Sequence, residues 1–137
     1  MIVYELNCKK CGYSLHFSHG VYRSFNKTNQ ELLERMKNGE LGEKFKKTAN
    51  EVLGAKAYHS YELFRCTKCG NLRGDMVIEL LGADNSVLAE EEHLCQNCNS
   101  KMEMLEGGTH YYKYELTCPR CKEAFDCLQP EAKLFAD

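Results

Sequence analysis

Eight of the nine cysteines in this 137-residue chain occur as four Cys-x-x-Cys pairs. The pairs are Cys8/Cys11, Cys66/Cys69, Cys95/Cys98 and Cys118/Cys121. Two thiolates separated by two residues can both point inward from one tight turn and occupy two corners of a tetrahedron, at about 2.3 Å from a zinc ion. Four pairs therefore supply two complete four-thiolate metal sites. A small domain with such sites is held together by metal more than by a large apolar core.

Disulfide bonds are the main alternative for a cysteine-rich chain, and the cellular compartment decides between the two. The first residues contain Glu5, Lys9 and Lys10, so they lack the apolar stretch of a secretory signal. The most apolar internal run, residues 76–83, is too short to span a bilayer and contains Glu79. We therefore expect a soluble cytoplasmic protein with no membrane association, in which thiols stay reduced or bind metal.

The grouping of the four pairs is predicted from their spacing. Nineteen residues separate Cys98 from Cys118, within the range of about 15 to 20 that is usual for zinc sites. These residues predict a hairpin, with strands over 102–105 and 110–116 and a turn at Gly107-Gly108. A hairpin brings its ends together, which favours sequential pairing. The expected sites are Cys8, Cys11, Cys66 and Cys69 (site 1), and Cys95, Cys98, Cys118 and Cys121 (site 2).

Two other groupings remain open. In nested pairing, Cys66/Cys69 shares a metal with Cys95/Cys98, and the outermost two pairs bring the termini together. In crossed pairing, the first pair joins the third and the second joins the fourth.

The residues around the pairs resemble a known family. The segments "LCQNCNSKMEML" and "YELTCPRCKEAF" look like the zinc-ribbon family, and "LNCKKCGYSL" resembles the same knuckle, with a Cys-Gly-Tyr that is also found in rubredoxins. The resemblance covers residues 91–128 well, and residues 1–20 and 58–81 moderately. It implies knuckles on facing hairpins of small three-stranded sheets and two structural Zn²⁺ ions, with iron as the less favoured metal. The whole arrangement also resembles small bacterial proteins with tandem zinc ribbons.

The expected fold is a small metal-bound α+β protein: two antiparallel zinc ribbons in tandem, with a two-helix insertion in the first. Ribbon 1 spans residues 1–81 and contains the insertion at 26–57. Residues 82–90 form a linker, ribbon 2 spans 91–128, and 129–137 is a tail.

The segment between the first two cysteine pairs changes its periodicity. Residues 13–25 alternate at first between apolar and polar side chains, which predicts a strand. The sequence Thr28-Asn-Gln-Glu31 then predicts a capping box that starts a helix, and Gly39 predicts its end. A second helix is expected over about 40–53, ended by Gly54.

The residue after each pair sits where the chain bends back sharply, which favours a positive φ. Gly12 and Gly70 satisfy this demand, and Asn99 is the next best residue. Lys122 does not, so the fourth turn is expected to be the most strained or the least regular.

Charge is unevenly distributed along the chain. Residues 1–68 hold 12 Lys and Arg against 7 Asp and Glu, a net of +5, whereas residues 69–137 hold 6 against 13, a net of −7, and the two sum to the formal −2 of the chain. The basic first half could contact an acidic partner or phosphate groups, or its lysines could form an ordinary solvated face. The candidate contact residues are Lys9, Lys10, Arg23, Lys37, Lys44, Lys46 and Lys47.

Other potential ligands and nucleophiles have simpler explanations. His16 and His19 would point to opposite faces of a strand, so joint metal binding would need a bend. Cys127 follows Phe125 at strand spacing and is expected to be a buried structural thiol. No catalytic arrangement stands out, and a full four-cysteine shell leaves zinc no position for a water molecule.

We therefore expect a non-enzymatic zinc-binding protein that acts as a protein-interaction or adaptor module with a protein partner. The alternative is an RNA- or DNA-binding accessory protein, and a minor alternative is a rubredoxin-like iron protein for electron transfer.

Overall fold

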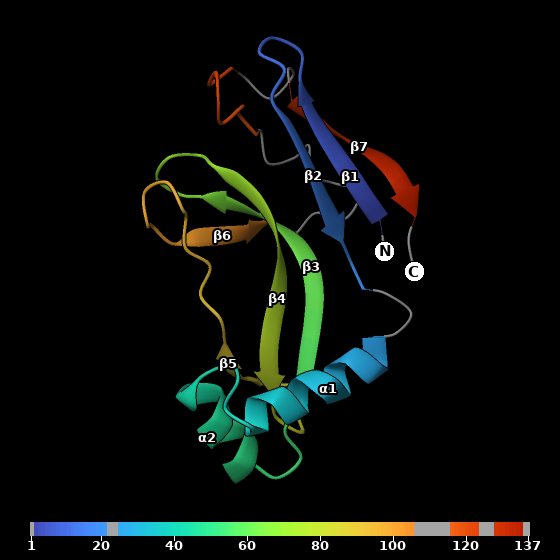
Figure 1. Cartoon of the computed structure of the whole chain (residues 1–137), viewed down its shortest axis with the longest axis vertical. Helices are drawn as coiled ribbons and strands as arrows, with labels where there is room; N and C mark the ends of the chain where they lie inside the picture. Colours follow the sequence, from blue (N-terminus) through green and yellow to red (C-terminus); the bar gives the residue numbers. More distant parts are fainter. Residues whose placement is uncertain (1, 22–24, 106–115, 124–127, 136–137) are drawn as a thin grey trace. The chain divides into compact units, whose positions relative to one another are not determined.

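The computed structural model describes residues 2–21, 25–105, 116–123 and 128–135 of the chain (Figure 1). It is a small α+β structure with two sheets, of strand order β2-β1-β7 and β5-β4-β3-β6. The strands are β1 (Ile2–Cys8), β2 (Ser14–His19), β3 (Lys56–Cys66), β4 (Leu72–Leu81), β5 (Val87–Glu90), β6 (Met102–Leu105) and β7 (Leu128–Phe135), and the helices are α1 (Phe25–Lys37) and α2 (Glu43–Glu51).

The chain divides into two compact units. Unit 1 comprises residues 1–20, 61–75 and 92–136, and unit 2 comprises residues 21–60, 76–91 and 137. The expected ribbons, 1–81 and 91–128, are therefore not the compact units. Residues 82–90, expected to be a linker, contain β5, which pairs antiparallel with β4. The expected tail, 129–137, contains most of β7.

In unit 1, the two ends of the chain lie in one sheet. The central strand β1 pairs antiparallel with β2 on one side, as the alternation after Cys11 predicts, and with β7 on the other. Pro130 lies within β7, at the edge of this sheet, where a residue that lacks an N–H group is tolerated. The register of β1 and β7 places Cys8 opposite Leu128, so the first and last strands of the chain are neighbours in the sheet.

One apolar core in unit 1 contains residues from both sheets. Leu6, Leu63 and Leu116 are completely buried in it, and Tyr4 stacks on Phe17 with ring centroids 5.3 Å apart. Leu72 and Leu105 complete the apolar cluster, together with Cys8 and Cys118. Strands of both sheets that lead into or out of the cysteine-bearing turns therefore pack in one apolar core.

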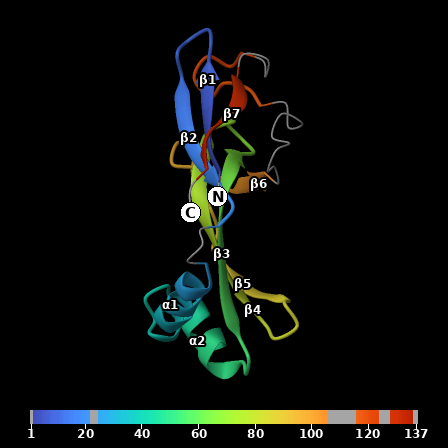
Figure 2. The same ribbon diagram turned by 90° about the vertical axis from the view of Figure 1, so that its right-hand side faces the viewer.

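Unit 2 contains both helices. Figure 2 shows α1 and α2 beside the ends of β3, β4 and β5. Buried side chains of the helices and strands form its core: Leu32, Met36, Phe45, Ala49, Ala57, Ile78, Leu80 and Ala89. Because short helices are marginal alone, this packing is what stabilises them.

The helices differ from expectation at three of their four ends. α1 already includes Phe25, so Thr28 lies inside the helix and the predicted capping box is wrong. Helix propensity and cap preference are weak local signals that the packing of the surrounding structure overrides, so the helix starts before the predicted cap. α1 does end as predicted, with Gly39 at φ 84° and hydrogen bonds from Gly39 N to Met36 O and Glu40 N to Arg35 O. α2 is shorter than residues 40–53, because Val52 is already extended.

Candidate metal centres

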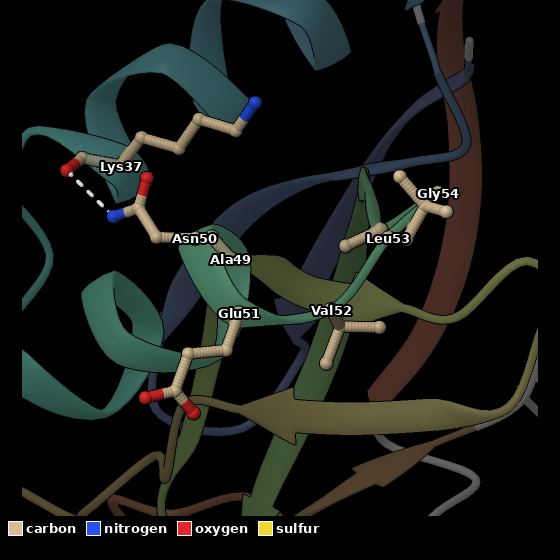
Figure 3. A pocket seen from close by; sticks show the side chains of 8 residues that line it. Lys37, Ala49, Asn50, Glu51, Val52, Leu53 and Gly54 are labelled. Atoms are coloured by element: carbon tan, nitrogen blue, oxygen red, sulfur yellow. Dashed lines mark hydrogen bonds between the residues drawn. The ribbon is translucent and has the colours of Figure 1, made fainter.

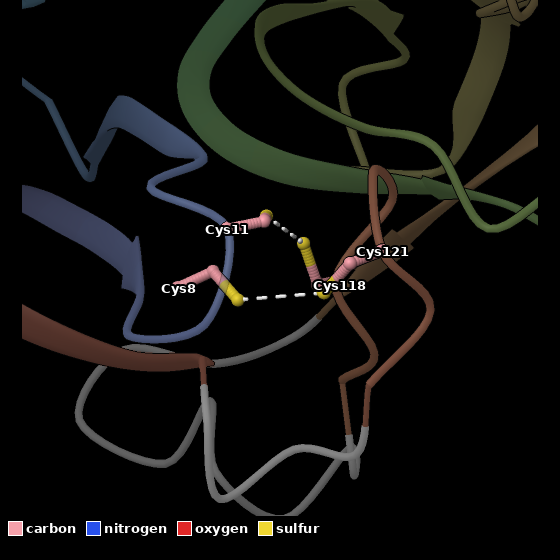
Figure 4. A group of neighbouring side chains, drawn as sticks. All are labelled: Cys8, Cys11, Cys118 and Cys121. Atoms are coloured by element: carbon pink, nitrogen blue, oxygen red, sulfur yellow. Dashed lines mark hydrogen bonds between the residues drawn. The ribbon is translucent and has the colours of Figure 1, made fainter.

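The eight paired cysteines come together in two groups of four. We name these centre A (Cys8, Cys11, Cys118 and Cys121) and centre B (Cys66, Cys69, Cys95 and Cys98). Figure 4 shows the side chains of centre A converging from two separate turns. This is nested pairing. The sequential grouping predicted from spacing, with Cys66 and Cys69 in site 1 and Cys95 and Cys98 in site 2, is wrong.

The strand pairing explains the nesting. Cys8 ends β1, and the partner strand β7 follows the Cys118–Cys121 turn in the chain, so these two turns meet at one end of the sheet. At centre B, Cys66 ends β3 and lies opposite Met102 of β6, which follows the Cys95–Cys98 turn. The predicted hairpin strand at 102–105 exists as β6, and it pairs with β3. The turn at Gly107-Gly108 and the strand over 110–116 lie, except for Leu116, outside the described residues.

The sulfur positions fit a metal ion. In each centre all four Sγ atoms lie within 4.8 Å of one another. The closest cross-turn Sγ–Sγ distances are 3.6 Å for Cys8–Cys121 and for Cys11–Cys118. In centre B they are 3.4 Å for Cys66–Cys98 and 3.6 Å for Cys69–Cys95. A tetrahedron with metal–sulfur bonds of about 2.3 Å has edges of about 3.8 Å, so both groups could hold one four-coordinate ion.

All four turns have the same backbone geometry. In each, the N–H of the first cysteine donates to the carbonyl five residues later, at 2.8–3.1 Å. The residue four positions after that cysteine donates back to its carbonyl, also at 2.8–3.1 Å. That residue has a positive φ in every turn: Gly12 (77°), Gly70 (79°), Asn99 (59°) and Lys122 (64°). The fourth turn is therefore as regular as the others and carries the strain that we expected, because a lysine adopts a left-handed conformation.

The thiols of each centre differ strongly in pKa. In centre A, hydrogen bonds from the Cys11 and Lys10 amides help to lower the pKa of Cys8 to about 7. For Cys121, the Glu123 amide lowers the pKa, but burial and the neighbouring thiols outweigh it and raise the pKa to about 12. In centre B, hydrogen bonds from Ser100 lower the pKa of Cys98 to about 6. The Asn71 amide lowers the pKa of Cys69, whereas burial and three thiols raise it to about 11.

This pattern is what four converging thiols produce. The first thiolate is stabilised by hydrogen bonds, and each further negative charge is opposed by the one already present. A divalent cation removes that opposition, because it lies between the sulfurs and favours the thiolate form of all four. The donor set therefore fits a thiophilic metal such as zinc.

Exposed cations surround the two centres. Lys10 forms an ion pair with Glu123 at 3.1 Å, and the Arg120 guanidinium approaches the Cys11 carbonyl at 3.5 Å. Lys122 Nζ donates to the Cys69 carbonyl at 3.0 Å, which connects a turn of centre A with a turn of centre B. We name the exposed basic residues of these turns and their flanks the knuckle face: Lys9, Lys10, Lys68, Lys101, Arg120 and Lys122.

The basic residues predicted from sequence are only partly in this set. Lys9 and Lys10 belong to the knuckle face in unit 1. Lys37, Lys44, Lys46 and Lys47 are exposed on the helices of unit 2, and Arg23 lies outside the described residues. Lys68, Lys101, Arg120 and Lys122 were missed. The signal that could have found them is the repeated turn itself, since a position between or just after paired cysteines is exposed.

The histidines after the first turn do not join a metal group among the described residues. His16 Nε2 lies 3.2 Å from Glu5, and His19 Nδ1 lies 2.9 Å from Glu62. Both are thus in contact with carboxylates of neighbouring strands. Cys127, expected to be a buried thiol, lies outside the described residues.

A polar cluster that sequence reasoning missed lies beside centre B. His93 Nδ1 contacts Asp75 at 2.9 Å, and Arg73 reaches the same carboxylate at 3.2 Å. The His93 ring stacks on Phe64 with centroids 4.1 Å apart, and Arg73 also donates to the Leu94 carbonyl at 3.0 Å. These contacts fix the segment that leads into Cys95.

No family model, curated protein or solved structure matches the chain. Among the described residues, no helix is long and apolar enough to cross a membrane.

Proposed function

We propose that the protein is a non-enzymatic zinc-binding protein in which two Zn²⁺ ions are structural and the folded units present surfaces to a protein partner. The observation that carries the proposal is the pair of complete four-cysteine groups. Structural zinc sites are closed by four protein ligands, whereas catalytic sites keep one position for water or substrate. In each centre the first cysteine of both turns is buried (Cys8, Cys66, Cys95 and Cys118), and the second is half-buried.

An exposed apolar feature of unit 2 supports partner binding. The turn after α2 carries Leu53, whose side chain is 97% exposed, next to Val52 at 36%. A hollow of about 260 Å³ lies at this turn, lined by Lys37 and residues 49–55 (Figure 3). The turn is held in place, since the Asn50 amide donates to the carbonyl of Lys37 at 3.2 Å and to that of Lys46 at 2.8 Å. Single exposed apolar residues are common on protein surfaces, but Leu53 and Val52 lie together beside this hollow and offer apolar area that a partner can bury.

Three measurements test this proposal. The purified protein should contain two equivalents of zinc, and a strong chelator should remove the hydrogen-exchange protection of unit 1. A red protein loaded with iron would favour electron transfer instead. Affinity capture with the zinc-loaded chain should recover a partner that Leu53→Ser no longer recovers, while Glu43→Ser, on an exposed position of α2, still does. Identical recovery with Leu53→Ser would contradict a role for this turn.

The knuckle face supports a second candidate, binding of RNA or DNA. Its six cations lie on or beside the four cysteine turns, which are connected by polar contacts. The Lys10–Glu123 ion pair connects the first turn with the fourth, and the Lys122–Cys69 hydrogen bond connects the fourth with the second. Thr67 Oγ1, in the second turn, donates to the carbonyl of Lys101, which follows the third turn. Five of the six are lysines, which contact phosphates as point charges without base specificity. Two loaded centres add about −4 behind this face, which weakens its field.

A salt titration separates the candidates. Binding of single-stranded DNA that weakens steeply between 50 and 200 mM salt, and that is lost in Lys9→Glu with Lys68→Glu, would favour the second. Absence of binding at low salt would exclude it.

A further inference from the structure

The fourth turn contains a residue that its backbone conformation disfavours. The equivalent position is glycine in two turns and asparagine in a third, the residue types that adopt a positive φ most readily. Lys122 takes φ 64° at this position and keeps the same hydrogen bond to the carbonyl of Cys118, at 2.9 Å. A lysine in this conformation costs backbone free energy that glycine would not, which directs attention to the contacts of its side chain.

The Lys122 side chain makes a specific contact with another cysteine turn. Lys122 Nζ donates to the carbonyl oxygen of Cys69 at 3.0 Å. Cys69 is a member of centre B, whereas Lys122 directly follows Cys121 of centre A. The contact therefore ties the backbone of a ligand in one centre to the turn that carries a ligand of the other.

The two turns also lie close together at a second place. A Cβ atom added to Gly70, the residue after Cys69, would lie 3.9 Å from Thr117 Oγ1, directly before Cys118. The Cys66–Gly70 turn therefore lies near both ends of the Cys118–Lys122 turn. Leu63, Leu116 and Cys118 also share one buried core. The Lys122–Cys69 hydrogen bond provides a direct route from the fourth turn to Cys69.

We propose that Lys122 is a positioning residue through which occupancy of centre A raises the metal affinity of centre B. This rests on the proposed function, because it assumes that both centres bind metal. An ion in centre A fixes Cys118 and Cys121 and so holds Lys122 in the left-handed conformation. Its ammonium group then holds the Cys69 carbonyl, and with it the Cys69 thiolate, in the ligating position. By linkage, occupancy of centre B raises the affinity of centre A by the same factor.

The charge arrangement supports the same direction. Each loaded four-thiolate centre carries a net −2, and two such groups in one small unit repel each other. That repulsion alone would make the second ion bind more weakly than the first. An ammonium group bonded between the two turns lowers the repulsion. Glu123, the nearest acidic residue in sequence, is paired with Lys10 at 3.1 Å.

The test uses the full chain loaded with cadmium, which gives one ¹¹³Cd resonance for each centre. The resonances are assigned from spectra of Cys11→Ser and Cys98→Ser. A competing chelator is then added in steps, and the intensity of each resonance reports the occupancy of its centre. The variants are Lys122→Met, which keeps the strained backbone and the apolar stem but loses the donor, and Lys122→Asn, which suits the backbone but cannot reach Cys69.

The matched control is Lys10→Met, because this lysine belongs to the same knuckle face and its ammonium group pairs with Glu123, beside the fourth turn. We expect both Lys122 variants to lower the cadmium affinity of centre B by at least about fivefold, the lower limit of common coupling between sites. Lys122→Asn should keep or raise the affinity of centre A, since it relieves the backbone. Lys10→Met should leave centre B unchanged.

Unchanged affinity of centre B in both Lys122 variants would overturn the inference, and so would an equal loss in Lys10→Met. If Lys122 were only a badly suited turn residue, Lys122→Asn would strengthen centre A and leave centre B as it was. Fewer than two cadmium ions per wild-type chain would instead refute the proposed function, so the two failures are distinguishable.

Discussion

Leu6→Ala tests whether one core supports both metal centres. Leu6 lies two residues before Cys8, its side chain is completely buried, and its core also contains Leu63 and Leu116. Truncation of a buried leucine to alanine costs about 2.7 to 5.0 kcal/mol, depending on how far the surroundings relax. β1 pairs on both sides, with Leu6 opposite Leu15 in β2 and Pro130 in β7. Little relaxation is therefore available, and we expect about 3 to 5 kcal/mol.

The assay is chemical denaturation of the metal-loaded protein, combined with hydrogen exchange of individual amides. The loss of stability should appear in β1 and β2 and equally in the Leu63–Cys66 segment of β3, because both sheets line the same core. The matched control is Leu53→Ala, the same truncation at a side chain that is 97% exposed, which should change stability by no more than about 0.5 kcal/mol. If protection fell in β1 and β2 while β3 was unaffected, the two centres would not share a core.

Three further predictions concern packing, pH and metal binding. Gly74→Ala should destabilise unit 1 by about 1 to 3 kcal/mol in urea denaturation. The new alanine Cβ would lie 2.7 Å from Phe17 Cβ, an atom that no rotamer change can move. A variant as stable as the wild type would refute that contact. Burial lowers the pKa of His59, so the folded form stays neutral while the unfolded chain binds a proton below about pH 6.5, and amide protection in unit 2 should fall as pH drops from 7.5 to 5.5. Asn29 Oδ1 lies 2.6 Å from His59 Nδ1, and His59→Gln should make this pH dependence shallower; an equally steep loss would show that another group causes it. The pKa values of Cys69 and Cys121 are raised to about 11 and about 12, so metal binding at neutral pH releases protons from these thiols. Zinc affinity, measured by chelator competition, should therefore rise between pH 6 and 8. An affinity that does not change with pH would contradict those values.

The local parts of the structure could be predicted because local geometry determines them. The Cys-x-x-Cys spacing predicts a ligand turn at each of the four pairs, and all four turns have the same hydrogen bonds. The positive φ at Gly12, Gly70 and Asn99 follows from that turn, as does the strain at Lys122. The strand after the first turn and the helix end at Gly39 were also readable, since both rest on periodicity or on a residue type within a few positions.

The grouping of the turns could not be predicted, because it depends on strand pairing between residues far apart in the chain. The decisive strand is β7, whose sequence contains Pro130 and alternates poorly, so it resembled a tail. Its partner β1 was recognised as a strand, but nothing in the sequence shows that its second edge is filled by the far end of the chain. The spacing favoured a shared metal site for Cys98 and Cys118, because closing a short loop costs little conformational entropy. The pairing of the strands outweighs that preference.

The distribution of charge along the chain was misleading for the same reason. A basic first half and an acidic second half suggested one basic surface from residues 9–47. Nested pairing instead brings Lys9 and Lys10 together with Arg120 and Lys122 from the other end of the chain. Charge segregation in sequence therefore does not describe charge segregation on the folded surface.

The most direct test of the nested arrangement is to identify the four cysteines bound to each metal ion. With ¹¹³Cd in both centres, scalar coupling between each cadmium nucleus and the cysteine Cβ protons reports its ligands one by one. The structure predicts that one cadmium couples to Cys8, Cys11, Cys118 and Cys121, and the other to Cys66, Cys69, Cys95 and Cys98. A single cadmium coupled to both Cys95 and Cys118 would contradict it.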